Sequence, residues 1–276
     1  MMKKSRRSFL KVAGIAAIGL GAAPAMNFAA SDSHGTAQAV KSKNEQALTA
    51  KRWGMVIDTN KITDDVVEAC TEACHKAHNV PDFNHEVDKE KYPKTRPVNH
   101  KQEIKWLWEE HFKYAFPDKE DQKEYIAEKY RELPFLVTCN HCKNAPCVQA
   151  CPTQATFKRA DGIVLMDYHR CIGCRFCMAA CPYGARSFNF RDPRPFIAEI
   201  APDFPTRSKG VVEKCNLCAE RLAKGEQPHC VEASEGAIVV GDLEDPESEV
   251  RALMNEHYTI RRKQSLGTEP SVYYVM

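Results

Sequence analysis

Thirteen cysteines crowd into one part of this 276-residue chain and constrain its fold more than any other feature. They are Cys70, Cys74, Cys139, Cys142, Cys147, Cys151, Cys171, Cys174, Cys177, Cys181, Cys215, Cys218 and Cys230. Most are only a few residues from the next, and thiols at such spacings are typical of metal ligands or disulfide partners. We therefore expect short elements and irregular loops that are cross-linked by metal ions or by disulfides.

The group at residues 171–182 has the most specific spacing. It reads Cys-Ile-Gly-Cys-Arg-Phe-Cys-Met-Ala-Ala-Cys-Pro, the C-x2-C-x2-C-x3-C-P run of bacterial ferredoxins. In such runs the first three thiolates bind one 4Fe-4S cluster and the fourth binds a second cluster. Gly173 allows the backbone to bend closely at this point. This run predicts iron–sulfur clusters rather than zinc or disulfides.

Three further groups vary the same arrangement. Residues 139–152 repeat it with a longer second gap, and Cys215, Cys218 and Cys230 form a third group in which Ser234 stands where a fourth cysteine would fall. Cys70 and Cys74 keep the third and fourth positions of a run whose first two positions hold Asp64 and Val67. Each group alone could bind zinc, but several groups with Cys-Pro endings favour clusters.

The N-terminus has the order of an export signal. Arg6 and Arg7 lie in a basic segment, the apolar run Val12–Ala25 follows, and residues 23–25 read Ala-Pro-Ala. Paired arginines before such a run indicate the twin-arginine (Tat) route, so we predict that residues 1–25 are a Tat-type signal peptide. The alternative is the basic start of an ordinary helix. Cleavage and retention as an anchor both fit the sequence.

Export and clusters are compatible, because the resemblance to Tat signals implies a protein that folds and takes up its cofactors before export. The expected location is the periplasmic side of the cytoplasmic membrane. No later segment has 18 uninterrupted apolar residues, so we expect the mature chain to lack a transmembrane helix. Without the five basic residues of the signal, 34 basic residues face 37 acidic ones, a balance of −3 that does not suggest nucleic-acid binding.

The chain divides by composition into a series of segments. We expect a signal (1–25), a linker (26–54), a degenerate first motif (55–80), a cysteine-free insert (81–134), a cluster-binding core (135–241) and a C-terminal tail (242–276). The tail is expected to pack on the first half or to reach a partner. The expected fold class is α+β.

Local patterns predict the main elements. We expect strands at 55–58, 188–191, 210–214 and 237–241, a helix at 64–76, a hairpin joining 155–159 to 162–167, and an amphipathic helix at 104–112. Trp106 and Trp108 are expected to be core or partner contacts. His75, His78 and His141 are expected to pack near a cluster and donate to sulfur rather than to bind metal.

The four cysteine motifs, the segments 55–58 and 269–274, and the order of these features resemble the four-motif iron–sulfur subunits of complex molybdoenzymes and related quinone-linked complexes. That family implies two ferredoxin-like halves in pseudo-twofold relation, with motif one paired to motif four and motif two to motif three. A narrower resemblance, through the degenerate first motif followed by His-Lys-Ala-His-Asn-Val-Pro and the long insert, is to the periplasmic DsrO-type subunits of DsrMKJOP membrane complexes.

The resemblance implies three 4Fe-4S clusters. Cluster a would be bound by Cys139, Cys142, Cys147 and Cys181; cluster b by Cys171, Cys174, Cys177 and Cys151; and cluster c by Cys215, Cys218, Cys230 and Cys74. The first site would keep Asp64, Val67, Cys70 and Ser234, of which only Cys70 offers a thiolate, so none of these four is expected to be a ligand.

We find no pattern of catalytic residues and expect an electron-transfer subunit that is not itself an enzyme. By resemblance, its partners would be an integral membrane subunit that interacts with quinone and a multihaem cytochrome c, in a complex of dissimilatory sulfur metabolism. An alternative is the iron–sulfur subunit of a hydrogenase, nitrite reductase or tetrathionate reductase. A disulfide-stapled binding protein and a zinc-bound interaction module are alternatives of other classes.

Overall fold

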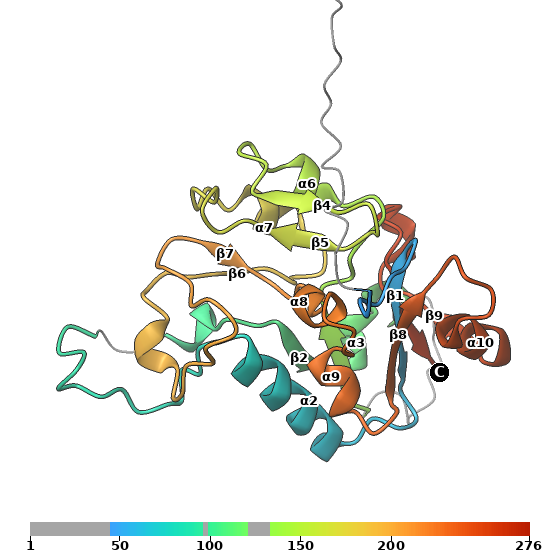
Figure 1. Ribbon diagram of the computed structural model, residues 1–276, viewed down its shortest axis with the longest axis horizontal. Coiled ribbons are helices and arrows are strands. Elements are labelled where there is room, and N and C mark those ends of the chain that lie inside the picture. Colours follow the sequence, from blue (N-terminus) through green and yellow to red (C-terminus); the bar gives the residue numbers. More distant parts are fainter. Residues whose placement is uncertain (1–44, 96–98, 121–132) are drawn as a thin grey trace, which may run out of the picture. The chain divides into compact units, whose positions relative to one another are not determined.

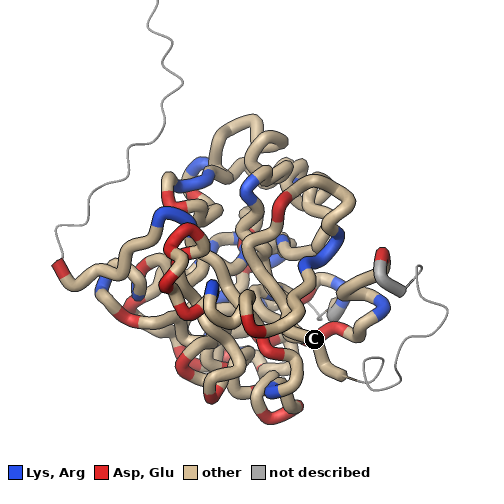
Figure 2. The backbone as a smooth tube through the Cα atoms, turned by 90° about the vertical axis from the view of Figure 1, so that its right-hand side faces the viewer, with Lys and Arg blue, Asp and Glu red and all other residues tan. Residues whose placement is uncertain are grey.

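The computed structural model describes residues 45–95, 99–120 and 133–276. The predicted signal peptide, residues 26–44 of the linker and two stretches of the insert lie outside the described residues. The described part has an α+β fold of small sheets and short helices (Figure 1). In the view of Figure 2, Lys and Arg are mixed with Asp and Glu along the described chain.

The largest sheet joins the two ends of the described chain. Its order is β8-β1-β10-β9, with β1 at Trp53–Asp58, β8 at Ile238–Asp242, β9 at Thr259–Ile260 and β10 at Val272–Val275. Strand β10 runs parallel to β1, whereas β8 is antiparallel to it, so that Met55 lies between Val272 and Val240. The predicted tail therefore packs on the first half and supplies a central strand of its sheet.

Alternating side chains of β1 enter two different cores. Met55 and Ile57 belong to the main core, whereas Val56 packs with Val250 of α10 (Glu249–Glu256) on the other face. This alternation is the normal consequence of the pleat of a strand. Both faces of the strand are covered, which explains why the segment is apolar throughout.

Helix α2 (Asp64–Ala77) confirms the helix predicted at 64–76. The Thr63 side chain accepts a hydrogen bond from the Val66 N–H at 3.3 Å and caps its N-terminus. Val67, Cys70 and Cys74 lie at helical spacing on its buried face. This face packs on α9 (His229–Glu232) and on β2 (Leu107–Glu110).

The helix predicted at 104–112 is wrong. Residues Leu107–Glu110 form strand β2, which pairs antiparallel with β3 (Phe135–Thr138). Apolar residues at 104, 106, 108 and 112 fit both periods, and the pairing with β3 decides between them. Trp106 and Trp108 are buried, which confirms them as core residues.

The remaining elements are short. The predicted hairpin forms as β4 (Thr156–Lys158) and β5 (Val164–Met166), and β6 (Ser187–Phe188) pairs with β7 (Val212–Glu213). The short α-helices are α3 (Phe112–Ala115), α4 (Pro117–Glu120), α6 (Pro146–Gln149), α7 (Phe176–Ala180) and α8 (Ala219–Leu222). Three 3-10 turns lie at His100–Gln102, Arg194–Phe196 and Gln264–Leu266. Within the described residues, no helix has the length and apolar character needed to span a membrane.

Candidate iron–sulfur sites

Twelve of the thirteen cysteines surround three cavities, four to each cavity. Cavity a is lined by Cys139, Cys142, Cys147 and Cys181; cavity b by Cys151, Cys171, Cys174 and Cys177; and cavity c by Cys74, Cys215, Cys218 and Cys230. All are free thiols. The structure thus brings together the three sets that the sequence resemblance implied, including Cys74, which is far in sequence from the other members of its set.

Short helices and left-handed residues hold the thiols around each cavity. Cys147, Cys177 and Cys230 lie in α6, α7 and α9, and each cavity takes one of them. His141 and Arg175 have positive φ angles of 42° and 63° in the loops between cysteines. Such residues reverse the chain direction so that neighbouring thiols converge.

Gly173 is required for a more specific reason than the sequence suggested. Its φ is +70°, and an added Cβ would collide with the carbonyl oxygen of Gly210. The loop of cavity b therefore lies directly against the segment that leads into β7. A side chain at residue 173 would separate the two.

The chemistry of the three cavities fits iron–sulfur clusters. Among the described residues no carboxylate lines any of them, and four soft thiol donors with an otherwise mostly apolar wall suit iron–sulfur binding. Two donors on the wall of cavity a, Asn140 Nδ2 and Arg186 Nη2, are buried without a partner among the described residues. Buried donors without partners are costly, and the sulfur atoms of a bound cluster would satisfy them.

Backbone amides also point at cysteine sulfur atoms. The N–H groups of Thr156, Val212 and Leu217 donate to the Sγ atoms of Cys151, Cys171 and Cys215 at 3.4, 3.5 and 3.3 Å. These bonds favour the thiolate form, because they stabilise negative charge on sulfur. For Cys151, burial raises the pKa, but the hydrogen bonds from Thr156 and Thr153 outweigh it and the net pKa is lowered.

Several other thiols favour the protonated form, because burial raises their pKa. Burial, followed by the charge of Cys139, raises the pKa of Cys142 to about 12. Burial, with the charges of Cys215, Cys230 and Cys218, also raises the pKa of Cys74 well above its usual value. Metal binding must therefore displace protons from these sites.

The four residues of the degenerate first site do not form a comparable cavity. Asp64 is exposed at the start of α2, and Val67 lies on the same helix beside a different cavity. Cys70 is fully buried and its Sγ donates to the Cys230 carbonyl at 3.3 Å. The Ser234 hydroxyl donates to Val231 O at 2.8 Å and accepts from the Ile238 N–H at 3.0 Å. Cys70 and Ser234 are thus engaged with backbone groups.

His78 supports cavity c as a hydrogen-bonding neighbour. Its Nδ1 lies 2.7 Å from the Cys74 carbonyl and 3.8 Å from Cys74 Sγ, and its Nε2 lies 2.9 Å from Glu220. Trp106 stacks on the ring at 4.7 Å. The ligand atoms of His78, Cys218 and Glu220 also lie within 4.8 Å of one another, but both His78 nitrogens are already engaged with protein groups. Sequence reasoning missed Glu220, which no local motif indicates.

A buried ion pair fixes the backbone next to His78. Arg207 and Glu213 are both fully buried and 2.6 Å apart, and Trp106 Nε1 donates to Glu213 at 2.8 Å. Arg207 also donates to the carbonyls of His78 and Asn79. The end of α2 is thereby tied to the strand that leads into the Cys215 motif.

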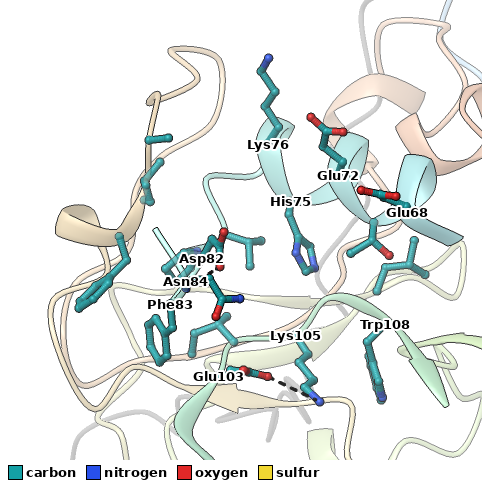
Figure 3. A pocket seen from close by; sticks show the side chains of 18 of the residues that line it. Glu68, Glu72, His75, Lys76, Asp82, Phe83, Asn84, Glu103, Lys105 and Trp108 are labelled. Atoms are coloured by element: carbon teal, nitrogen blue, oxygen red, sulfur yellow. Dashed lines mark hydrogen bonds and ion pairs between the residues drawn. The ribbon is translucent and has the colours of Figure 1, made fainter. Parts of the chain in front are cut away.

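A larger cavity of about 850 Å³ lies on another side of α2 and contains no cysteine (Figure 3). Glu68, Glu72 and His75 of α2 line it, opposite Glu103 and Lys105 (Figure 3). Burial lowers the pKa of His75 to about 4. Although this cavity is larger than the three cysteine-lined ones, carboxylates rather than thiols line it, so it does not suit a cluster.

Comparisons with known proteins agree with the cavities. A family model described as a 4Fe-4S dicluster domain matches residues 133–193. The sequence is 38% identical to the Hdr-like menaquinol oxidoreductase iron-sulfur subunit 1 of Archaeoglobus fulgidus, over 98% of this protein and 97% of that one. It is 34% identical to the menaquinone reductase iron-sulfur cluster-binding subunit of Nitratidesulfovibrio vulgaris, over 81% and 88% of the two proteins. It is 33% identical to the arsenate respiratory reductase iron-sulfur subunit ArrB of a Shewanella species, over 81% and 96%.

The cavities and the fold define an iron–sulfur protein with ferredoxin-type sites. This protein belongs to the family of 4Fe-4S iron–sulfur subunits of oxidoreductases that includes these relatives.

Proposed function

We propose that this protein is a non-catalytic subunit that relays electrons between an integral membrane subunit interacting with quinone and a second redox subunit, a multihaem cytochrome c. The observation that carries the proposal is the series of three cavities with four thiols each. Each 4Fe-4S cluster, when bound, supplies a one-electron redox centre. With four thiolates per cluster, no position is left for a substrate.

The twelve cysteines would be the ligands, in the three sets given above. Cavity a has both other cavities as neighbours: Thr138 lines cavity c and the next residue, Cys139, lines cavity a. Helix α6 places Cys147 at cavity a, and Cys151 just beyond it lines cavity b. Neighbouring cavities of this kind suit a relay of electrons between two partners.

Cavities b and c differ in the exposure of their cysteines. At cavity b, Cys174 is exposed and Cys151 and Cys171 are half-buried. At cavity c, Cys74, Cys218 and Cys230 are buried. A partner can therefore approach cavity b more directly than cavity c.

The family's pseudo-twofold arrangement is part of the proposal. Helices α6 and α7 pack together and carry motifs two and three, and α2 and α9 pack together and carry motifs one and four. In α6–α7, the third cysteine of each motif and the cysteine four positions later line different cavities. In α2–α9 the corresponding positions are Cys70 with Cys74 and Cys230 with Ser234, and one member of each pair lines cavity c. This repetition supports two related halves.

For the complex itself, we propose a DsrMKJOP-type assembly of dissimilatory sulfur metabolism on the periplasmic side of the membrane. The N-terminal paired arginines and the degenerate first motif support this assignment. The quinone-linked names of the Archaeoglobus and Nitratidesulfovibrio relatives support the link to menaquinone.

The test uses the full-length protein carrying an affinity tag in its native host. We expect it to be recovered from detergent-solubilised membranes with an integral membrane subunit, and its visible cluster absorption to bleach when a menaquinol analogue is added. The isolated protein should bleach with dithionite but not with the quinol, because it lacks the quinone site. Recovery without a membrane subunit, or equal reduction of the isolated protein by quinol, would contradict the proposal.

A further inference from the structure

Two buried cations without acidic partners lie at the boundaries between the three cavities. Arg186 is 4% exposed and Lys214 is 2% exposed. Neither forms an ion pair with a carboxylate within the described residues. A buried charge normally requires a partner of opposite charge, because removing it from water is expensive.

Arg186 lies between cavities a and b. It lines cavity a, and its Nη1 donates to Thr156 Oγ1 at 3.2 Å and to Met166 Sδ at 3.1 Å. Thr156 and Met166 both line cavity b. Burial lowers the pKa of Arg186, but the charges of Cys147, Cys177 and Cys139 outweigh it and the net pKa is raised. Cys147 belongs to cavity a and Cys177 to cavity b.

Lys214 occupies the corresponding position between cavities a and c. Its Nζ donates to the carbonyl of Val164, which lines cavity a, and to the carbonyl of Cys215, which lines cavity c, the latter at 2.6 Å. The two carbonyl groups accept hydrogen bonds from two of the three N–H groups of the ammonium but do not neutralise its charge.

Other buried arginines differ from these two cations, either because they have an acidic partner or because they reach only one cavity. Arg207 is equally buried, yet it forms an ion pair with Glu213, so that pair is neutral. Arg262 has no acidic partner either, but its guanidinium lies over the Tyr183 ring on the wall of cavity a and does not reach a second cavity. Among the described residues, only the boundary cations each contact the walls of two cavities.

We propose that Arg186 and Lys214 are the built-in countercharges of the clusters, Arg186 acting on clusters a and b and Lys214 on clusters c and a. The inference rests on the proposed function, because it requires clusters in all three cavities. A cluster held by four thiolates is anionic and gains a further negative charge on reduction. A fixed cation nearby favours the reduced form and raises the reduction potential.

The two residues are positioning residues that act on the clusters by charge. Because Arg186 serves cavities a and b and Lys214 serves cavities a and c, cluster a has both cations as neighbours. We therefore expect the central cluster to be the most easily reduced of the three, other factors being equal. An electron would then be held at cluster a in the partly reduced protein.

The test is a redox titration of the anaerobically purified full-length protein, followed by electron paramagnetic resonance. In Arg186→Gln we expect the equilibrium constant for reduction of clusters a and b to fall about tenfold. This lowers each of their reduction potentials by about 59 mV for one electron and leaves that of cluster c unchanged. In Lys214→Met, clusters c and a should shift and cluster b should not. The signal of cluster c is identified by its loss in Cys74→Ala.

Charge-retaining variants separate charge from hydrogen bonding. Arg186→Lys and Lys214→Arg should keep potentials near those of the unmodified protein, and Arg251→Gln on α10 controls for a cation remote from the cavities. If a neutral variant fails to bind iron while its charge-retaining counterpart binds it fully, the charge is required and the proposal is supported. The proposal would be overturned if the neutral variants bind all clusters and keep unchanged reduction potentials. It would also be overturned if the charge-retaining variants show the same shifts in potential as the neutral ones. Absence of clusters from the unmodified protein would instead refute the proposed function.

Discussion

At the scale of single residues, two cysteines of one helix have different surroundings. Cys70 and Cys74 both lie on the buried face of α2. Cys74 lines cavity c, whereas the Cys70 sulfur donates to a backbone carbonyl of α9. The same helix therefore carries a candidate ligand and a packing residue four positions apart.

We predict that Cys74→Ala removes or damages cluster c alone. The site loses one of its four thiolates, and the other thiol of α2, that of Cys70, is hydrogen-bonded to the Cys230 carbonyl. Electron paramagnetic resonance should show one cubane signal fewer, or one converted to a three-iron form. An unchanged spectrum would refute the assignment of Cys74.

Cys70→Ser is the matched variant and should leave all clusters in place. The serine hydroxyl can donate to the Cys230 carbonyl as the thiol does, so we expect a loss of only about 1 kcal/mol in the free energy of unfolding. Iron analysis and a denaturation curve measure the two effects. Loss of a cluster signal would show that the first site binds metal after all.

At the scale of elements, the C-terminal strand β10 packs on β3 and on the insert through Tyr274. Tyr274 is fully buried, donates to Leu136 O at 3.2 Å and packs against Phe116 at 5.1 Å between ring centres. It thereby connects the tail to the insert and to β3, the strand that leads into the Cys139 motif.

We predict that Tyr274→Ala lowers the free energy of unfolding by about 3–5 kcal/mol, because it leaves a large cavity in the core. Tyr258→Ala is the control, since Tyr258 is 73% exposed and its removal should change stability by no more than about 0.5 kcal/mol. Thermal denaturation of the loaded proteins compares them. Equal effects would show that β10 is not a central strand.

At the scale of the whole molecule, the number of four-thiol cavities determines how much iron the protein holds. Three cavities with four thiols each predict about 12 iron and about 12 acid-labile sulfide atoms per molecule. Iron and sulfide assays on anaerobically purified protein measure both. A value near 16 would mean that the first site is filled, and a value near 8 would exclude one of the three.

Export of the folded protein is the second prediction at this scale. Replacing Arg6 and Arg7 by Lys should leave a cluster-loaded protein in the cytoplasm, because the signal is an address that a receptor recognises. Cell fractionation with the iron content of each fraction measures this. A periplasmic variant would contradict the Tat assignment.

The sequence alone determined the features that depend on local spacing. Its cysteine runs indicated the cluster motifs, and short-range patterns predicted α2, β1 and the β4–β5 hairpin. These elements follow from neighbouring residues, because side-chain periodicity and turn residues act over a few positions. The grouping of the twelve cysteines also followed from the family resemblance, and the structure places each group around one cavity.

The tertiary structure decided the features that depend on contacts between distant segments. Residues 107–110 form a strand because β3 lies beside them, and the tail becomes a central strand because β1 leaves an edge open to it. Arg186 and Lys214 carry no motif, and their positions between cavities appear only once the segments that bear the cysteines pack together. Strand pairing and the environment of a buried charge arise from long-range packing, which a local pattern does not encode.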